Sequence, residues 1–100
     1  MKIVAVTACP TGIAHTYMAA DALMKAAPKH NVQIKVETQG ANGIINRITD
    51  KDIAKARFVI FAHDVAIKEP ERFRKMKVLD VSTKDAMLNA AALLQAKRIP

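Results

Sequence analysis

The sequence is poor in the residues from which several common kinds of site are built. It has one cysteine, no tryptophan and 4% aromatic residues among its 100 positions. A single cysteine excludes an internal disulfide and a cysteine-based metal cluster, so we expect a reduced, cytoplasmic chain without a metal or cofactor. The low aromatic content argues against the stacking surfaces that bind single-stranded nucleic acid. No run of about 18 apolar residues occurs, so the sequence predicts no membrane span of its own.

The chain has an excess of basic residues. It contains sixteen Lys and Arg residues and nine Asp and Glu residues, which gives a formal net charge of +7. This balance favours anionic partners, either acidic protein surfaces or phosphate groups. No recognition helix or zinc finger is present, so nucleic acid is not expected among them. Several basic residues form either a solvated face or a surface for acidic partners: Arg47, Lys68, Arg72, Arg74 and Lys75.

Four segments have the patterns of β-strands. Residues 2–8 (KIVAVTA) and 58–62 (FVIFA) are almost continuously apolar, which is typical of strands buried on both faces. Residues 32–37 alternate apolar and polar side chains and indicate a half-exposed strand, with Gln33, Lys35 and Glu37 on its polar side. Residues 78–81 (VLDV) are short and predict an edge strand.

Three segments predict helices. The first runs from about residue 13 to residue 27 and ends at Pro28. Thr49 followed by Asp52, and Ser82 followed by Asp85, predict N-caps with an acidic residue in the first turn. The second of these opens one last helix over STKDAMLNAAALLQAK.

Strands that alternate with helices predict a single α/β domain over residues 1–100, with helices on both faces of a parallel sheet. The two fully apolar strands belong in the centre, so the predicted order of the four strands is 2-1-3-4, with right-handed crossovers. Ligands of such sheets bind outside the carboxyl ends of the strands, where the strand order reverses. The loop at that point follows the first strand and begins with Cys9.

The residues of this loop suit an anion. Gly12 allows close approach of the backbone to a ligand, and the helix that follows directs free N–H groups and its dipole at the loop. A thiol in that field has a lowered pKa and becomes a nucleophile. Phosphoryl transfer through a covalent intermediate is the favoured chemistry. The predicted phosphate loop comprises Pro10, Thr11, Gly12, Ile13, Ala14, His15 and Thr16.

Three other interpretations remain open on the residues alone. In the first, Cys9 is a small buried residue in an ordinary turn. In the second, the chain is an anion- or protein-binding regulatory module without turnover. The third is a low-molecular-weight cysteine phosphatase, whose phosphate loop has the pattern C-x5-R. Here the sixth position after Cys9 is His15, and no Arg or Lys lies between Cys9 and Leu23. Rapid hydrolysis of a phosphocysteine then lacks its main electrostatic support, which favours a carrier over a phosphatase.

The run VTACPTGIAHTYMAADAL resembles the fructose-family IIB component of the phosphoenolpyruvate-dependent sugar phosphotransferase system (PTS). The similarity continues through ETQGANGIINRIT, DIAKARFVIFAHDVAI and RFRKMKVLDVST, and so covers essentially the whole chain. The family usually has Ala-Asp where this chain has His63 and Asp64.

The resemblance implies a four-stranded parallel α/β phosphotransferase whose cysteine, Cys9 here, becomes phosphorylated. The phosphoryl group comes from a phosphohistidine of the IIA component and passes to a fructose-like sugar held by the membrane IIC component. We also expect four residues after the second and third strands to line the rim of the site: Gln39, Gly40, His63 and Asp64. The sequence assigns His15 to the phosphate loop without a particular role for its side chain, and it specifies neither the sugar nor the oligomeric state.

Overall fold

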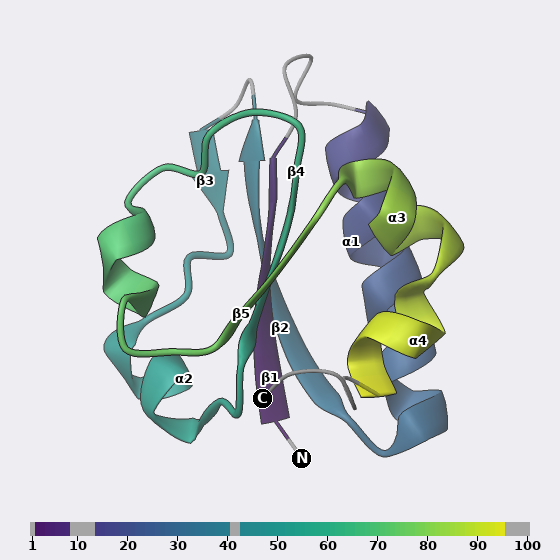
Figure 1. The fold of residues 1–100 in the computed structure, drawn as a ribbon, viewed down its shortest axis with the longest axis horizontal. Coiled ribbons are helices and arrows are strands. Elements are labelled where there is room, and N and C mark those ends of the chain that lie inside the picture. The colour runs from purple at the N-terminus through teal and green to yellow at the C-terminus, as the bar shows by residue number, and fades with distance from the viewer. Residues whose placement is uncertain (1, 9–13, 41–42, 96–100) are drawn as a thin grey trace.

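A five-stranded sheet forms the centre of the protein, which is described by a computed structural model (Figure 1). The structure describes residues 2–8, 14–40 and 43–95, without the side chains of 14–16 and 95. The spatial order of the strands is β3-β2-β1-β4-β5. Their bounds are β1 Lys2–Ala8, β2 Gln33–Gly40, β3 Gly43–Ile45, β4 Val59–His63 and β5 Val78–Val81.

The four predicted strands are present, and β2, β1, β4 and β5 are parallel neighbours in the predicted order. The prediction of a purely parallel, four-stranded sheet is wrong, because β3 pairs antiparallel with the last three residues of β2. Gly43 has a φ of +84°, a conformation that glycine adopts without steric cost, where the chain returns alongside β2. The end of β2 is therefore not a sheet edge, and Gln39 and Gly40 belong to the strand.

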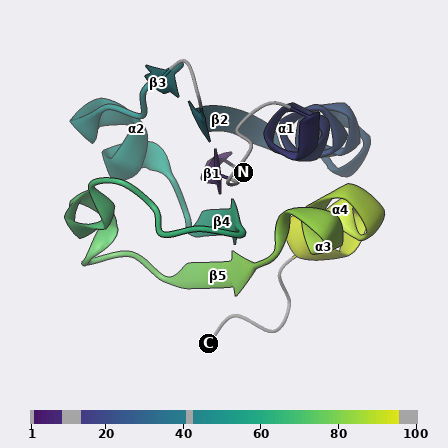
Figure 2. The same ribbon diagram turned by 90° about the horizontal axis from the view of Figure 1, so that it is seen from above.

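Helices cover both faces of the sheet, as the sequence predicts (Figure 2). One layer contains α1 (Ala14–Ala26), α3 (Thr83–Leu88), α4 (Ala90–Gln95) and the 3₁₀ helix η1 (Ala27–His30). The other layer contains α2 (Asp50–Lys55) and the 3₁₀ helix η2 (Pro70–Phe73). Within the described residues, no helix has the length and apolar character needed to cross a membrane.

The helix ends follow local sequence signals. Thr49 and Asp52 form a reciprocal capping box at the start of α2, and the Ser82 side chain accepts a hydrogen bond from the Asp85 N–H at the start of α3. The helix α1 ends at Ala26 and is followed directly by η1, in which Pro28 is the second residue. The prediction of one last helix is wrong, because the chain forms two helices there. Asn89 has φ −127° and ψ 29°, outside the helical region, and separates α3 from α4. Asparagine is a weak helix former because its side chain competes for backbone hydrogen bonds.

Side chains of β1 alternate between two apolar cores. Ile3 and Ala5 pack on the α1 side, whereas Val4, Val6 and Ala8 pack on the α2 side. Burial on both faces explains why the sequence of β1 is almost continuously apolar. The predicted exposed face of β2 is wrong for its second half, because Glu37 is 0% exposed. That carboxylate has partners inside the α2-side layer.

Candidate functional site

The carboxyl end of β1 lies between two of the predicted rim residues. Ala8, the last residue of β1, is the register partner of Gln39 on β2 and of His63 on β4. The Asp64 N–H donates to the Ala8 carbonyl over 2.9 Å, which continues the pairing past the end of β4. The strand order reverses between β1 and β4, so this end of the sheet contains the switch point where α/β sheets bind ligands. Cys9 is the next residue of the sequence and lies outside the described residues.

The predicted phosphate loop is described only in part. Residues 9–13 lie outside the described residues, and Ala14, His15 and Thr16 are described as helical backbone alone. The helix α1 begins at Ala14, is 13 residues long and has no acidic residue in its first turn. Its free N–H groups and the positive end of its dipole therefore favour an anion at its start.

Gln39 does not present its amide to solvent. It is 4% exposed, and its Nε2 donates to Glu37 over 2.7 Å and to the Lys68 carbonyl over 3.1 Å. Its Oε1 accepts from the Lys68 N–H over 2.7 Å. These hydrogen bonds connect the segment after β4, at Lys68, to the end of β2 beside Ala8.

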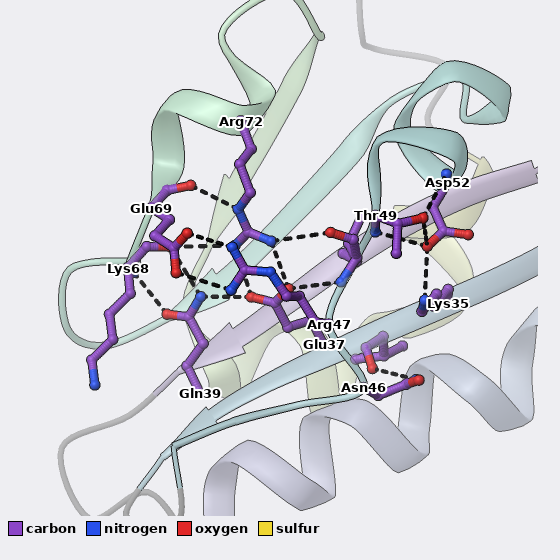
Figure 3. A network of polar contacts seen from close by, with 12 residues as sticks. Lys35, Glu37, Gln39, Asn46, Arg47, Thr49, Asp52, Lys68, Glu69 and Arg72 are labelled. Atoms are coloured by element: carbon purple, nitrogen blue, oxygen red, sulfur yellow. Dashed lines mark hydrogen bonds and ion pairs between the residues drawn. The ribbon is translucent and has the colours of Figure 1, made fainter.

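A buried ion pair lies next to Gln39 (Figure 3). Two guanidinium nitrogens of Arg72 donate to the two carboxylate oxygens of Glu37 at 2.8 and 2.9 Å. The Ile48 N–H donates to the same carboxylate over 2.9 Å. Burial opposes the charge of Glu37, but the hydrogen bonds from Arg72, Ile48 and Gln39 outweigh it, so the pKa of Glu37 is lowered. Glu37 raises the pKa of Arg72 in turn.

Sequence reasoning missed this pair. It placed Glu37 on an exposed face, and it counted Arg72 with a basic surface. The available signal was the position of Glu37 beside the predicted central strand: it is the register partner of Val6, and residues 3–8 of β1 are all buried. A second cation of the expected basic surface, Arg47, is also paired, because its guanidinium binds the Glu69 carboxylate. That contact lowers the pKa of Glu69 and raises that of Arg47.

The predicted rim residues His63 and Asp64 have partners on β5 and α3. The ring of His63 contacts the Val65 carbonyl through Nδ1 at 2.6 Å and Asp80 through Nε2 at 2.9 Å. The Asp64 carboxylate accepts from the Thr83 hydroxyl at 2.5 Å and from the Thr83 N–H at 3.3 Å. His63 and Asp64 thus join the carboxyl ends of β4 and β5 to the start of α3. Among the described residues, no three His, Cys, Asp or Glu side chains group together as metal ligands.

These features define a class of protein: an α/β domain whose first strand ends at the switch point, with the one cysteine of the sequence directly after that strand and a helix start without acidic residues five positions further on. Residues 4–96 match the family described as "PTS system, Lactose/Cellobiose specific IIB subunit". The chain is 48% identical over 93 residues to the "PTS system fructose-like EIIB component 2" of Escherichia coli K12, which covers 93% of this chain and 88% of that protein. The chain therefore belongs to the PTS IIB family.

Two further relatives place the chain within the family. A domain of the fructose-specific IIABC component of Borrelia burgdorferi has a solved structure that is 44% identical, with a TM-score of 0.92 over 99% of this chain and 95% of that one. The 2-O-alpha-mannosyl-D-glycerate-specific EIIABC component of Escherichia coli K12 is 53% identical over 93 residues, which are 93% of this chain and 14% of that protein. The sugars in these two names differ, so similarity to the domain does not identify a sugar.

Proposed function

We propose that this chain is a phosphoryl carrier that accepts a phosphoryl group on Cys9. The observation that carries the proposal is the register at the end of β1: Ala8 lies between Gln39 and His63 at the switch point, and the only thiol of the chain comes next. Membership of the PTS IIB family supports the same role. The start of α1, without an acidic side chain, favours the thiolate and the phosphoryl dianion alike.

The proposed reaction has two displacements at phosphorus. The Cys9 thiolate attacks the phosphorus of a phosphohistidine on the IIA component; the S–P bond forms, the P–N bond breaks, and the histidine nitrogen leaves with the electron pair. A sugar hydroxyl then attacks the same phosphorus. The O–P bond forms, the S–P bond breaks, Cys9 leaves as thiolate, and the hydroxyl proton passes to a base.

The proposed partners follow from this sequence of transfers. The donor is a IIA component on the cytoplasmic side, and the acceptor is a fructose-like sugar held by a membrane IIC component. Loop residues Pro10 to Thr16 hold the phosphoryl oxygens, chiefly through backbone N–H groups. The absence of arginine from positions 10–16 keeps the phosphocysteine from rapid hydrolysis, which suits a carrier.

The direct test is transfer from a phosphorylated IIA component. Wild-type chain, Cys9→Ser and Cys9→Ala are each mixed with phospho-IIA, and uptake of one phosphoryl group is followed by intact-mass spectrometry. We expect uptake by the wild type and none by either variant, with all three equally folded by circular dichroism. A Cys9→Ser variant that takes up the group as well as the wild type contradicts the proposal. Rapid turnover of an aryl phosphate by the wild type supports the phosphatase instead.

A further inference from the structure

Two buried hydroxyls near the end of β1 have no hydrogen-bond partner within the described part of the chain. They belong to Thr7 and Thr38, which are 0% and 7% exposed. The two residues are register partners on the parallel strands β1 and β2. Their side chains therefore lie next to each other on the same face of the sheet. Most buried polar groups are hydrogen-bonded, so an adjacent pair without partners needs an explanation.

The face that carries both hydroxyls is the face that α1 covers. Thr7 follows Ile3 and Ala5 at the period of two residues, and Thr38 likewise follows Val36. Ile3, Ala5 and Val36 all pack in the core cluster that includes Ala19 and Ala20 of α1. Thr7 is the last residue but one of β1, so the hydroxyls lie at the end of the sheet where β1 ends and α1 starts (Figure 1).

Valine has almost the same shape as threonine and fills comparable positions in these strands, at Val4, Val6 and Val36. A valine at position 7 or 38 would pack equally well without leaving a hydroxyl unsatisfied. Two threonines at this place are therefore a cost to the unliganded protein. The cost is explained if the hydroxyls gain a partner in another state of the protein.

We propose that the Thr7 and Thr38 hydroxyls donate hydrogen bonds to the phosphoryl group carried by Cys9, an inference that rests on the proposed carrier function. Thr7 is two residues before Cys9, and Thr38 is its neighbour on the adjacent strand. Hydrogen bonds to a phosphoryl dianion are charge-assisted and stronger than neutral ones. The hydroxyls would thus stabilise the phosphorylated state more than the free state, and so set how far phosphoryl transfer proceeds.

This role predicts opposite responses to two substitutions at one position. Thr7→Val removes the hydroxyl and keeps the shape, so the free energy of unfolding of the unphosphorylated chain stays the same or rises. Thr7→Ser keeps the hydroxyl and removes a buried methyl group, so the unphosphorylated chain becomes less stable. A purely structural hydroxyl, bonded within the unphosphorylated chain, predicts that Thr7→Val is destabilising.

The experiment measures two quantities for wild type, Thr7→Val, Thr38→Val and Thr7→Ser. Urea unfolding gives the stability of the unphosphorylated chain, and intact-mass spectrometry gives the equilibrium between phospho-IIA and the phosphorylated chain. We expect each valine variant to shift that equilibrium about tenfold towards IIA, because a hydrogen bond to a charged group is lost. Thr7→Ser should keep it within about twofold of the wild type, since the charged-group hydrogen bond remains.

Valine variants that leave the transfer equilibrium unchanged overturn the inference, and so does a Thr7→Val chain that is less stable than the wild type. In both cases the carrier function stands, because the wild type still becomes phosphorylated. A wild type that takes up no phosphoryl group from IIA overturns the carrier function first and this inference with it.

Discussion

Glu37 and Arg72 are 35 residues apart in the sequence and form a two-point ion pair inside the protein. Glu37 is fully buried, and the Arg72 side chain is 12% exposed. The pair joins the middle of β2 to η2, and Arg72 also donates to the Ile48 and Lys68 carbonyls. Gln39 connects the same network to the end of β2, next to Ala8 (Figure 3). The buried network thus holds the segment after β4 beside the candidate site.

Removal of Arg72 should be strongly destabilising. Arg72→Ala leaves the Glu37 carboxylate buried without its cation, which costs about 3–5 kcal/mol in comparable pairs. Urea or thermal unfolding at neutral pH measures the loss. Arg47→Ala is the matched control, because it removes an arginine from the exposed pair with Glu69 and should cost far less. Equal losses for the two variants would contradict the importance given to the buried pair.

The stability of the protein should fall in acid partly because of Glu37. The folded protein lowers the pKa of this carboxyl below its usual value of 4.5, so its contribution to stability is present above pH 4.5. The contribution is lost as the pH falls from there through the lowered pKa of the folded state. Unfolding free energies measured across this range should therefore decline less steeply in Glu37→Gln, which is also less stable at neutral pH.

Glu71→Gln is the control for this pH experiment. Glu71 is an exposed residue of η2, and its replacement changes the net charge by the same amount. We expect Glu71→Gln to keep the pH dependence of the wild type. A Glu37→Gln chain whose stability declines as steeply as the wild type would show that this carboxyl does not couple folding to pH.

Local signals in the sequence were sufficient for much of the fold. The capping box of Thr49 and Asp52 depends on residues three positions apart, and the continuous apolar runs of β1 and β4 reflect burial on both faces. The antiparallel β3 was missed because three residues are too few to show a period. Glu37 was misplaced because its cation is distant in the sequence, and a strand pattern cannot reveal such a partner.

The candidate site was predictable to a different extent. The order of the parallel strands brought Gln39 and His63 to either side of Ala8, as expected for residues at the carboxyl ends of neighbouring strands. The side-chain contacts were not predictable, because Gln39 binds the main chain of Lys68, and His63 binds Asp80 on the neighbouring strand. Both contacts depend on how the segment after β4 folds back. The roles given to residues 9–16 stay predictions.

Asp64 should stabilise the start of α3. Its carboxylate accepts two hydrogen bonds from Thr83, the first residue of that helix. The negative charge of the carboxylate also interacts favourably with the positive end of the helix dipole. Asp64→Ala should lower the free energy of unfolding by about 0.5–2 kcal/mol, as the loss of other helix-capping side chains does. Asp21→Ala is the comparison, because Asp21 forms an exposed ion pair with Lys25. A smaller loss for Asp64→Ala than for Asp21→Ala would refute this role.

The central claim is that the phosphoryl group is carried by sulfur. The chain offers four candidate acceptors, namely Cys9 and the three histidines His15, His30 and His63. After reaction with phospho-IIA, tandem mass spectrometry of peptides and ³¹P nuclear magnetic resonance locate the group. The account predicts a single phosphothiol on Cys9, still formed when each histidine is replaced by alanine. A phosphoryl group on a histidine nitrogen, or uptake by Cys9→Ala, would contradict it.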